Sequence, residues 1–116
     1  MGFAFGNQQK YVEAEEAYRR AIDIDPRDSD HWTNLGFALE NQDKNPEAEE
    51  AHHRAIEIDP KSDKAWYNLG VALGNQEKYA EAEEAYRRAI DIDPQDEEFW
   101  DNLGIALDDQ TKYAEA

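Results

Sequence analysis

The fourteen residues EAEEAYRRAIDIDP stand at Glu13–Pro26 and recur letter for letter at Glu81–Pro94. A near copy, EAEEAHHRAIEIDP, lies midway between them at Glu47–Pro60, so the three copies are 34 residues apart. The tryptophans and several glycines keep the same step: Trp32, Trp66, Trp100, Gly2, Gly36, Gly70 and Gly104. Self-similarity at a fixed period of this length predicts a solenoid, in which each unit buries its apolar face against its neighbours.

Composition narrows the classes of function. The chain of 116 residues has 28 Asp and Glu against 12 Lys and Arg, a formal net charge of −16. This charge repels nucleic-acid phosphates and anionic lipid, so we expect neither nucleic acid nor a membrane as a partner. The sequence has no apolar run of about 18 residues and no N-terminal secretion signal. With no Cys, we expect no thiolate metal site and a cytoplasmic location.

Each unit is predicted to hold two helices. In Ser29–Pro60, apolar or aromatic residues recur at i, i+3, i+4 and i+7 in both halves, the spacing of one helix face. These residues are Trp32, Leu35, Gly36 and Leu39 in the first half, and Ala48, Ala51, His52 and Ala55 in the second. The polar stretch ENQDKN separates the halves, and Pro46 suits the first turn of the second helix. Asp59 ends that helix because the residue before a proline avoids the α region.

The motif W-x-x-L-G at 32–36, 66–70 and 100–104, followed by alanines and a proline at fixed offsets, resembles the tetratricopeptide (TPR) repeat. The later positions are Ala48, Ala82, Ala55, Ala89, Pro60 and Pro94. The resemblance covers essentially the whole chain. It implies an all-α fold of stacked antiparallel helix pairs in a right-handed superhelix, and a protein-interaction scaffold without catalysis or cofactor. Small residues such as Gly36 are expected to let paired helices approach closely.

The register predicts a partial repeat at 1–28, repeats at 29–62 and 63–96, and a partial repeat at 97–116. We expect the chain to start at Met1 inside a first helix that lacks its tryptophan position, and the second helix to follow in Glu13–Pro26. Residues 111–116, TKYAEA, are expected to open a second helix. Near-identical units and mid-repeat ends also suit a rival hypothesis. In it, the chain is a structural or engineered segment without a natural ligand that self-associates through its terminal helices as a homo-oligomer.

A second face of the first helices predicts a binding site. One apolar position, five residues after the tryptophan position, is shared by Phe3, Phe37, Val71 and Ile105. Polar residues three before or four after it lie on the same face: Asn34, Asn68, Asn102, Asn7, Asn41, Asn75 and Asp109. Carboxamides can donate to and accept from an extended peptide backbone. The family resemblance places these positions, with Thr33 and Tyr67, in a concave peptide-binding groove. The alternative, that the asparagines tether one helix to the next, stays open.

One branch of the family grips a C-terminal carboxylate with Lys, Asn and Arg side chains. Asn34 and Lys64 stand at two of those positions, but Asn68 replaces the Arg. In the preceding unit, Phe3 stands at a position where that branch has Asn. Carboxylates stand nearby: Asp101, Asp108 and Asp109. The sequence therefore favours a basic or amphipathic protein or peptide as the partner.

His52 stands where the verbatim copies have Tyr18 and Tyr86, so we expect it in the core rather than in a metal site. Asn45 likewise replaces a tyrosine, which predicts that the second unit is the least stable. The sequence has no recognisable nucleophile and base set and no phosphate-binding loop.

Overall fold

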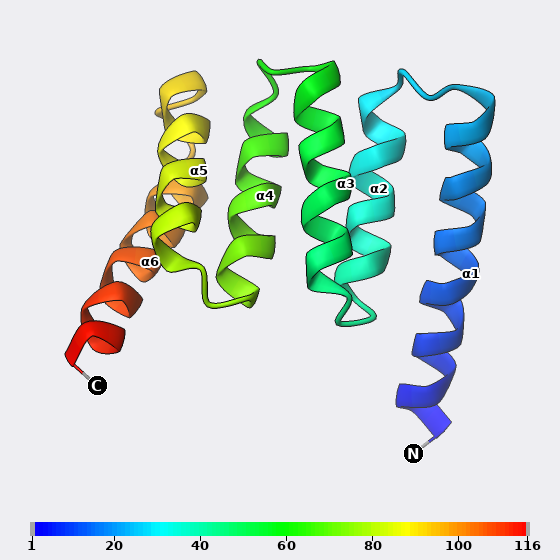
Figure 1. Cartoon of the computed structure of the whole chain (residues 1–116), viewed down its shortest axis with the longest axis horizontal. Coiled ribbons are helices and arrows are strands. Elements are labelled where there is room, and N and C mark those ends of the chain that lie inside the picture. Colours follow the sequence, from blue (N-terminus) through cyan, green and yellow to red (C-terminus); the bar gives the residue numbers. More distant parts are fainter. Residues whose placement is uncertain (1, 116) are drawn as a thin grey trace.

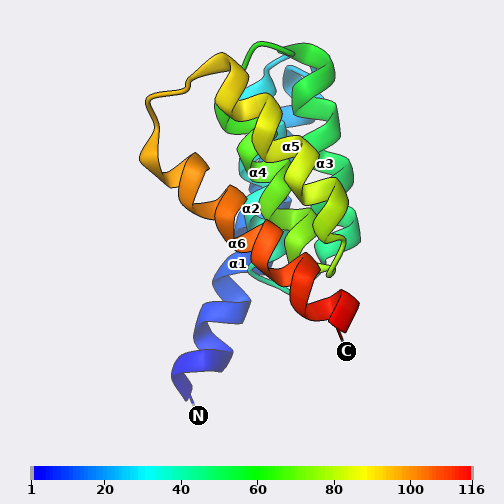
Figure 2. The ribbon, with the colours of Figure 1, turned by 90° about the vertical axis from the view of Figure 1, so that its left-hand side faces the viewer.

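The computed structural model describes the backbone of residues 2–115 and the side chains of residues 8–112. This part of the chain forms six α-helices and no strand, which confirms the predicted all-α fold. The helices are α1 (Gly2–Ile24), α2 (Ser29–Glu40), α3 (Asn45–Ile58), α4 (Asp63–Asn75), α5 (Tyr79–Ile92) and α6 (Glu97–Glu115). They stand side by side in chain order (Figure 1). In the turned view, α3 and α5 form one layer and α2, α4 and α6 the other (Figure 2).

The first helix of each unit begins at a side-chain cap. Asp28 accepts a hydrogen bond from the backbone N–H of Asp30, and the Ser62 hydroxyl accepts one from Ala65. Asp96, another 34 residues on, accepts one from Glu98 at 2.9 Å. Such caps satisfy N–H groups that have no partner within the helix. The repeated cap therefore sets the start of α2, α4 and α6.

Glycines bring the two helices of a unit together. A Cβ on Gly70 in α4 would lie 2.5 Å from the Tyr86 ring of α5, and a Cβ on Gly36 would overlap the His52 ring. Real Cβ atoms do not approach other heavy atoms so closely, so both positions require glycine at this helix spacing. This confirms the predicted role of Gly36. His52 is 0% exposed, which confirms its predicted place in the core.

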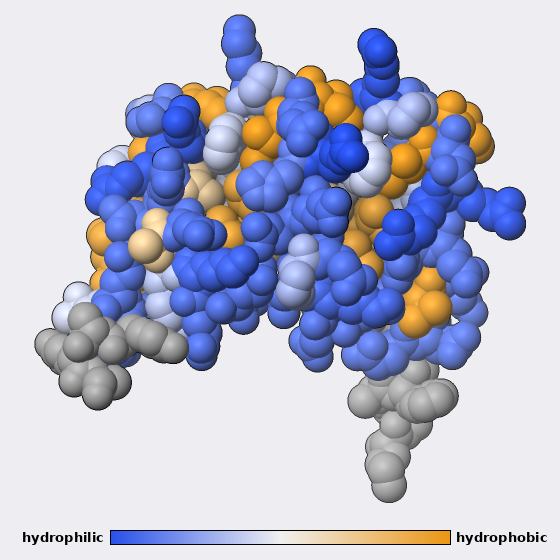
Figure 3. Space-filling model, viewed as in Figure 1, coloured by the Kyte–Doolittle hydropathy of each residue, from blue (hydrophilic) through white to orange (hydrophobic). Residues whose placement is uncertain are grey.

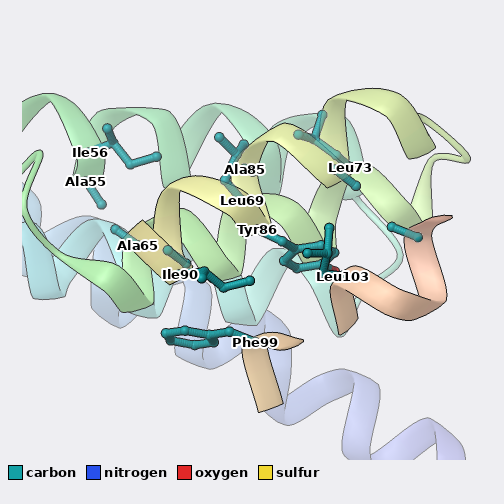
Figure 4. Close-up of a cluster of buried hydrophobic side chains, with 13 residues drawn as sticks. Ala55, Ile56, Ala65, Leu69, Leu73, Ala85, Tyr86, Ile90, Phe99 and Leu103 are labelled. Atoms are coloured by element: carbon teal, nitrogen blue, oxygen red, sulfur yellow. The ribbon is translucent and has the colours of Figure 1, made fainter. Parts of the chain in front are cut away.

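The buried core runs along the solenoid. One cluster joins α3, α4, α5 and α6 and includes Leu69, Tyr86 and Phe99 (Figure 4). A second cluster lies between α1, α2 and α3, and Trp32 packs against both clusters. Each helix pair therefore shares its core with the next, as the repeat period predicts.

Repeated hydrogen bonds tie consecutive units together. Gln76, the C-cap residue of α4, donates from Nε2 to Glu49 Oε1 in α3 at 2.8 Å. The same bond joins Gln42 to Glu15 and Gln110 to Glu83. Burial raises the pKa of Glu49, but hydrogen bonds from Gln76 and Lys78 outweigh it and leave that pKa below its ordinary value. The tryptophans add a second tie, because each indole N–H donates to the carbonyl of a linker proline, as Trp32 does to Pro26 at 3.0 Å.

The two end helices correct the sequence analysis. We expected a turn before the second helix in the first partial repeat, and a new helix at TKYAEA. Instead α1 and α6 are each continuous. In the complete units this turn holds Asp43 and Glu77 at φ of 60° and 63°. The left-handed region costs a non-glycine residue roughly 1–2 kcal/mol, which packing of a whole helix pair offsets. Gln9 in α1 and Thr111 in α6 occupy the same repeat position as Asp43 and Glu77. At these two residues the helix continues, because continued helical hydrogen bonding is more favourable there than a turn with positive φ.

No helix in the described part of the chain is long and apolar enough to cross a membrane. Hydrophilic residues dominate the surface seen in Figure 3, where apolar residues form separate patches.

Candidate binding face

A cavity of about 260 Å³, the central cavity, opens on the face formed by α2, α4 and α6. Five residues predicted for the groove line it: Thr33, Phe37, Lys64, Tyr67 and Asn68. Residues that the sequence analysis did not select also line it: Ser29, Asp30, Ser62, Asp96, Glu98 and Phe99. The central cavity therefore draws on three successive first helices and on the caps at their starts.

Aromatic rings form the apolar part of the central cavity. The Tyr67 ring lies 5.1 Å from the Phe99 ring and 5.9 Å from the Tyr86 ring, centroid to centroid. Phe37 stands edge-on to His52 at 5.8 Å and is 42% exposed. Tilted and edge-on contacts of this kind fix the ring planes. Phe37 and Tyr67 thus present apolar surface to the cavity from two helices.

Asn68 is the most unusual polar side chain of the central cavity. It is 6% exposed and lines the cavity from α4. Among the described residues, its carboxamide makes no hydrogen bond, yet its polar atoms are not sealed from solvent. Buried polar groups nearly always have a partner, so this side chain has donor and acceptor capacity to offer a ligand.

Carboxylates outnumber cationic groups at the cavity. Asp30, Asp96 and Glu98 line it together with a single ammonium group, that of Lys64. Burial raises the pKa of the Tyr67 hydroxyl, and the charge of Glu98 raises it further. The described residues hold no cluster of three or more metal-ligating side chains. The potential at the cavity therefore favours a cationic group.

A second cavity of about 190 Å³, the side cavity, lies between α4, α5 and α6. It gathers five more residues of the predicted face: Val71, Asn75, Asn102, Ile105 and Asp109. Asn102 Nδ2 donates to the Glu98 carbonyl at 2.9 Å and to the Tyr67 hydroxyl at 3.4 Å. At this position the carboxamide joins α6 to α4, as the tether alternative requires.

The remaining predicted residues lie outside both cavities. Asn34 is partly buried and lines neither cavity. Exposed Asn41, the C-cap residue of α2, donates to the carbonyl of Phe37 in that helix. The side chains of Phe3 and Asn7 are outside the described residues. The carboxylates that the sequence analysis missed had a signal, because Asp30, Lys64 and Glu98 share one position of the repeat. Of the three residues at this position, only Lys64 was predicted for the groove.

Three family models of the tetratricopeptide repeat match this chain, over residues 1–28, 17–50 and 63–96. The chain belongs to the tetratricopeptide repeat family. It is thus a TPR solenoid. A search of the curated proteins finds no match to it.

Solved TPR domains share the fold over nearly the whole chain. The first TPR domain of human RPAP3 is 25% identical, with a TM-score of 0.89 over 99% of this chain and 91% of that one. The Sgt2 TPR domain from Aspergillus fumigatus is 25% identical, with a TM-score of 0.87 over 99% and 78%. The first TPR of Spaghetti (RPAP3), bound to the HSP90 peptide SRMEEVD, is 26% identical, with a TM-score of 0.85 over 95% and 87%.

Proposed function

We propose that this TPR chain is a non-catalytic scaffold that binds an extended peptide along the face of α2, α4 and α6, and that the peptide is basic or amphipathic. The unpartnered carboxamide of Asn68 is the observation that carries this proposal. One carboxamide offers an acceptor oxygen and two N–H donors, which match the two hydrogen-bonding groups of a peptide unit. A peptide backbone in the central cavity would supply both missing partners.

The aromatic rings supply the apolar part of recognition. Phe37 and Tyr67 stand on neighbouring first helices, and Phe99 completes the wall from α6. An apolar side chain of the peptide that covers them is removed from water, which stabilises binding by about 25 cal/mol for each Å² buried. Groove-bound peptides commonly combine backbone hydrogen bonds with a few such pockets. This arrangement favours an amphipathic peptide.

Charge sets the expected sign of the partner. Asp30, Asp96 and Glu98 face the cavity against Lys64 alone, and the whole chain carries −16. A Lys or Arg side chain of the peptide has its complement there, whereas a carboxylate meets repulsion.

This expectation differs from the peptides of two solved neighbours. The first TPR of Spaghetti is bound to SRMEEVD, and the second TPR domain of human RPAP3 is in complex with the HSP70 peptide SGPTIEEVD. Both peptides end in the acidic sequence EEVD. In this chain Asn68 stands where the carboxylate-gripping branch has an Arg, so the planar guanidinium that binds a carboxylate in two-point contact is missing.

The test is a binding titration with two labelled peptides of equal length, one alternating Arg and Leu and the other alternating Glu and Leu, with SRMEEVD as a third probe. We expect the basic peptide to bind and its association rate to fall as salt rises, because screening shortens to about 8 Å at physiological ionic strength. Preference for either acidic peptide, or indifference to salt, contradicts the proposal.

Two variants localise the contact. Asn68→Ala removes two hydrogen bonds to the peptide backbone and should weaken binding about tenfold. Glu98→Gln removes one cavity charge and should weaken binding of the basic peptide about two- to fivefold. The matched control is Glu97→Gln, which removes the same charge one residue away, outside the cavity, and should have a smaller effect. Equal effects at the two positions would mean that only net charge matters.

A further inference from the structure

The two complete units bury one face of the first helix beneath the second helix. In α4 this face packs on α5, where the Tyr86 ring lies on Gly70 and Arg88 stands over the Trp66 ring at 5.6 Å. The pair α2 and α3 repeats both contacts, with the His52 ring on Gly36 and Arg54 over Trp32 at 5.9 Å. These contacts define how a second helix covers a first helix in this chain.

Among the described residues, no second helix covers the same face of α6, although Leu103 within it is buried in the core. Its residues Trp100, Leu103, Gly104 and Leu107 repeat those of α4 at Trp66, Leu69, Gly70 and Leu73. Trp100 is 50% exposed and Leu107 is 39% exposed, whereas Leu73 of α4 is 4% exposed. A Cβ on Gly104 would meet no atom within 4 Å. The site for an aromatic ring on this glycine is therefore open.

Helix α1 carries the matching half of the contact. Its residues from Glu13 on are letter for letter those of α5, so it has each residue with which α5 covers α4. Ala17 is exposed and Tyr18 is half-buried, whereas the equivalent Ala85 and Tyr86 of α5 are 3% and 5% exposed. Because α1 is one continuous helix, it does not fold back over this face.

We propose that α6 of one molecule packs against the Glu13–Ile24 half of α1 of a second molecule, in the manner of α4 on α5. In this contact the Tyr18 ring of the second molecule lies on Gly104, and its Arg20 stands over the Trp100 ring. The occupant of the open α6 face is thus a second copy of this chain, because the chain already forms this pair of sequences internally. The contact does not use the face of α2, α4 and α6 proposed for peptides.

The geometry makes the contact head-to-tail. Each molecule uses two different surfaces, α6 and α1, so a pair leaves one of each open and further molecules can add. The net charge of −16 on each copy opposes association. Screening of that repulsion should strengthen the contact at high salt, the opposite of the salt effect expected for the basic peptide.

Sedimentation velocity over a concentration series, at low salt and at about 0.5 M salt, tests the proposal. We expect the average mass to rise beyond two copies as concentration rises at high salt, from the 13.4 kDa of one chain. Gly104→Ala places one Cβ where the Tyr18 ring should lie and should weaken association about tenfold or more. Gly74→Ala is the matched control, because its Cβ also meets no atom within 4 Å and lies away from the contact.

A mixing experiment tests the direction of the contact. Ala17→Glu blocks the α1 surface and leaves α6 intact, whereas Gly104→Ala blocks α6 and leaves α1 intact. Each variant alone should stay monomeric, and an equimolar mixture should form a species of two chains that grows no further. Circular dichroism checks that both variants are folded. A constant mass of 13.4 kDa for the parent, equal association of the Gly104→Ala and Gly74→Ala variants, or no pairing in the mixture would each overturn the proposal.

Discussion

The contact between Gly70 and Tyr86 allows a quantitative test of how the helix pairs are held. Gly70→Ala places a Cβ 2.5 Å from Tyr86 Cε1 and 2.6 Å from its Cδ1. Carbon atoms in contact normally lie about 3.5–4.0 Å apart, so the ring or the helix has to move by about 1 Å. Tyr86 is 5% exposed and packs against Tyr67, so the ring has little room to turn. Overpacking of this kind costs typically 1–3 kcal/mol.

The same substitution has a favourable part, because alanine stabilises a helix interior by about 0.5–1 kcal/mol over glycine. Gly74→Ala, in the same helix, isolates that gain, since its Cβ meets no atom within 4 Å. We expect Gly74→Ala to raise the free energy of unfolding, and Gly70→Ala to lie about 1–3 kcal/mol below Gly74→Ala, a gap of several degrees in Tm. Urea unfolding followed by far-UV circular dichroism measures both. Equal stability of the two variants would refute the close-packing argument.

Two further predictions concern single side chains. His52→Tyr should raise Tm by a few degrees, because it removes a buried Nδ1 without a partner and restores the ring that Tyr86 provides; an unchanged or lower Tm contradicts this. The pKa of Glu49 is lower in the folded protein than its ordinary value of 4.5. Its carboxylate therefore stabilises the fold at pH values above 4.5, and this contribution is lost as the pH falls through the lowered pKa. In urea melts, the Glu49→Gln variant should therefore lose less free energy of unfolding than the parent between neutral pH and about pH 4. An equal loss would mean that this carboxylate does not contribute to the acid sensitivity of the fold.

The repeat pattern predicted the complete units well because each signal there is local. Spacing of the apolar residues gave the buried face of α2, Pro46 gave the first turn of α3, and Asp59 before Pro60 gave its end. The Gln76 to Glu49 bond was not predicted, because the two residues lie in different units and polar residues at those positions are typical of any exposed helix. Nothing in their spacing indicates a contact.

The central cavity was predicted only in part, because the carboxylates named from the sequence, Asp101, Asp108 and Asp109, are not the ones that line it. Carboxylate recognition drew attention to Lys64, whereas Asp30 and Glu98 occupy the same repeat position in the neighbouring units. The structure brings the three first helices together, so these side chains line one cavity. The excess of carboxylates at this position is visible in the sequence only when the three units are aligned with one another.

Helices α4 and α6 show that nearly identical local sequences take different environments in a repeat protein. Gly70 stands in NLGVAL and Gly104 in NLGIAL, yet a Cβ overlaps a ring at the first and meets no atom at the second. Each unit's stability depends on the helix that packs on it, so the sequence around a glycine cannot by itself specify burial. It follows that Gly→Ala should have opposite effects at these two positions in an isolated molecule, destabilising at Gly70 and stabilising at Gly104. If molecules stack through α6 and α1, the effect at Gly104 should become unfavourable for assembly while remaining favourable for the fold.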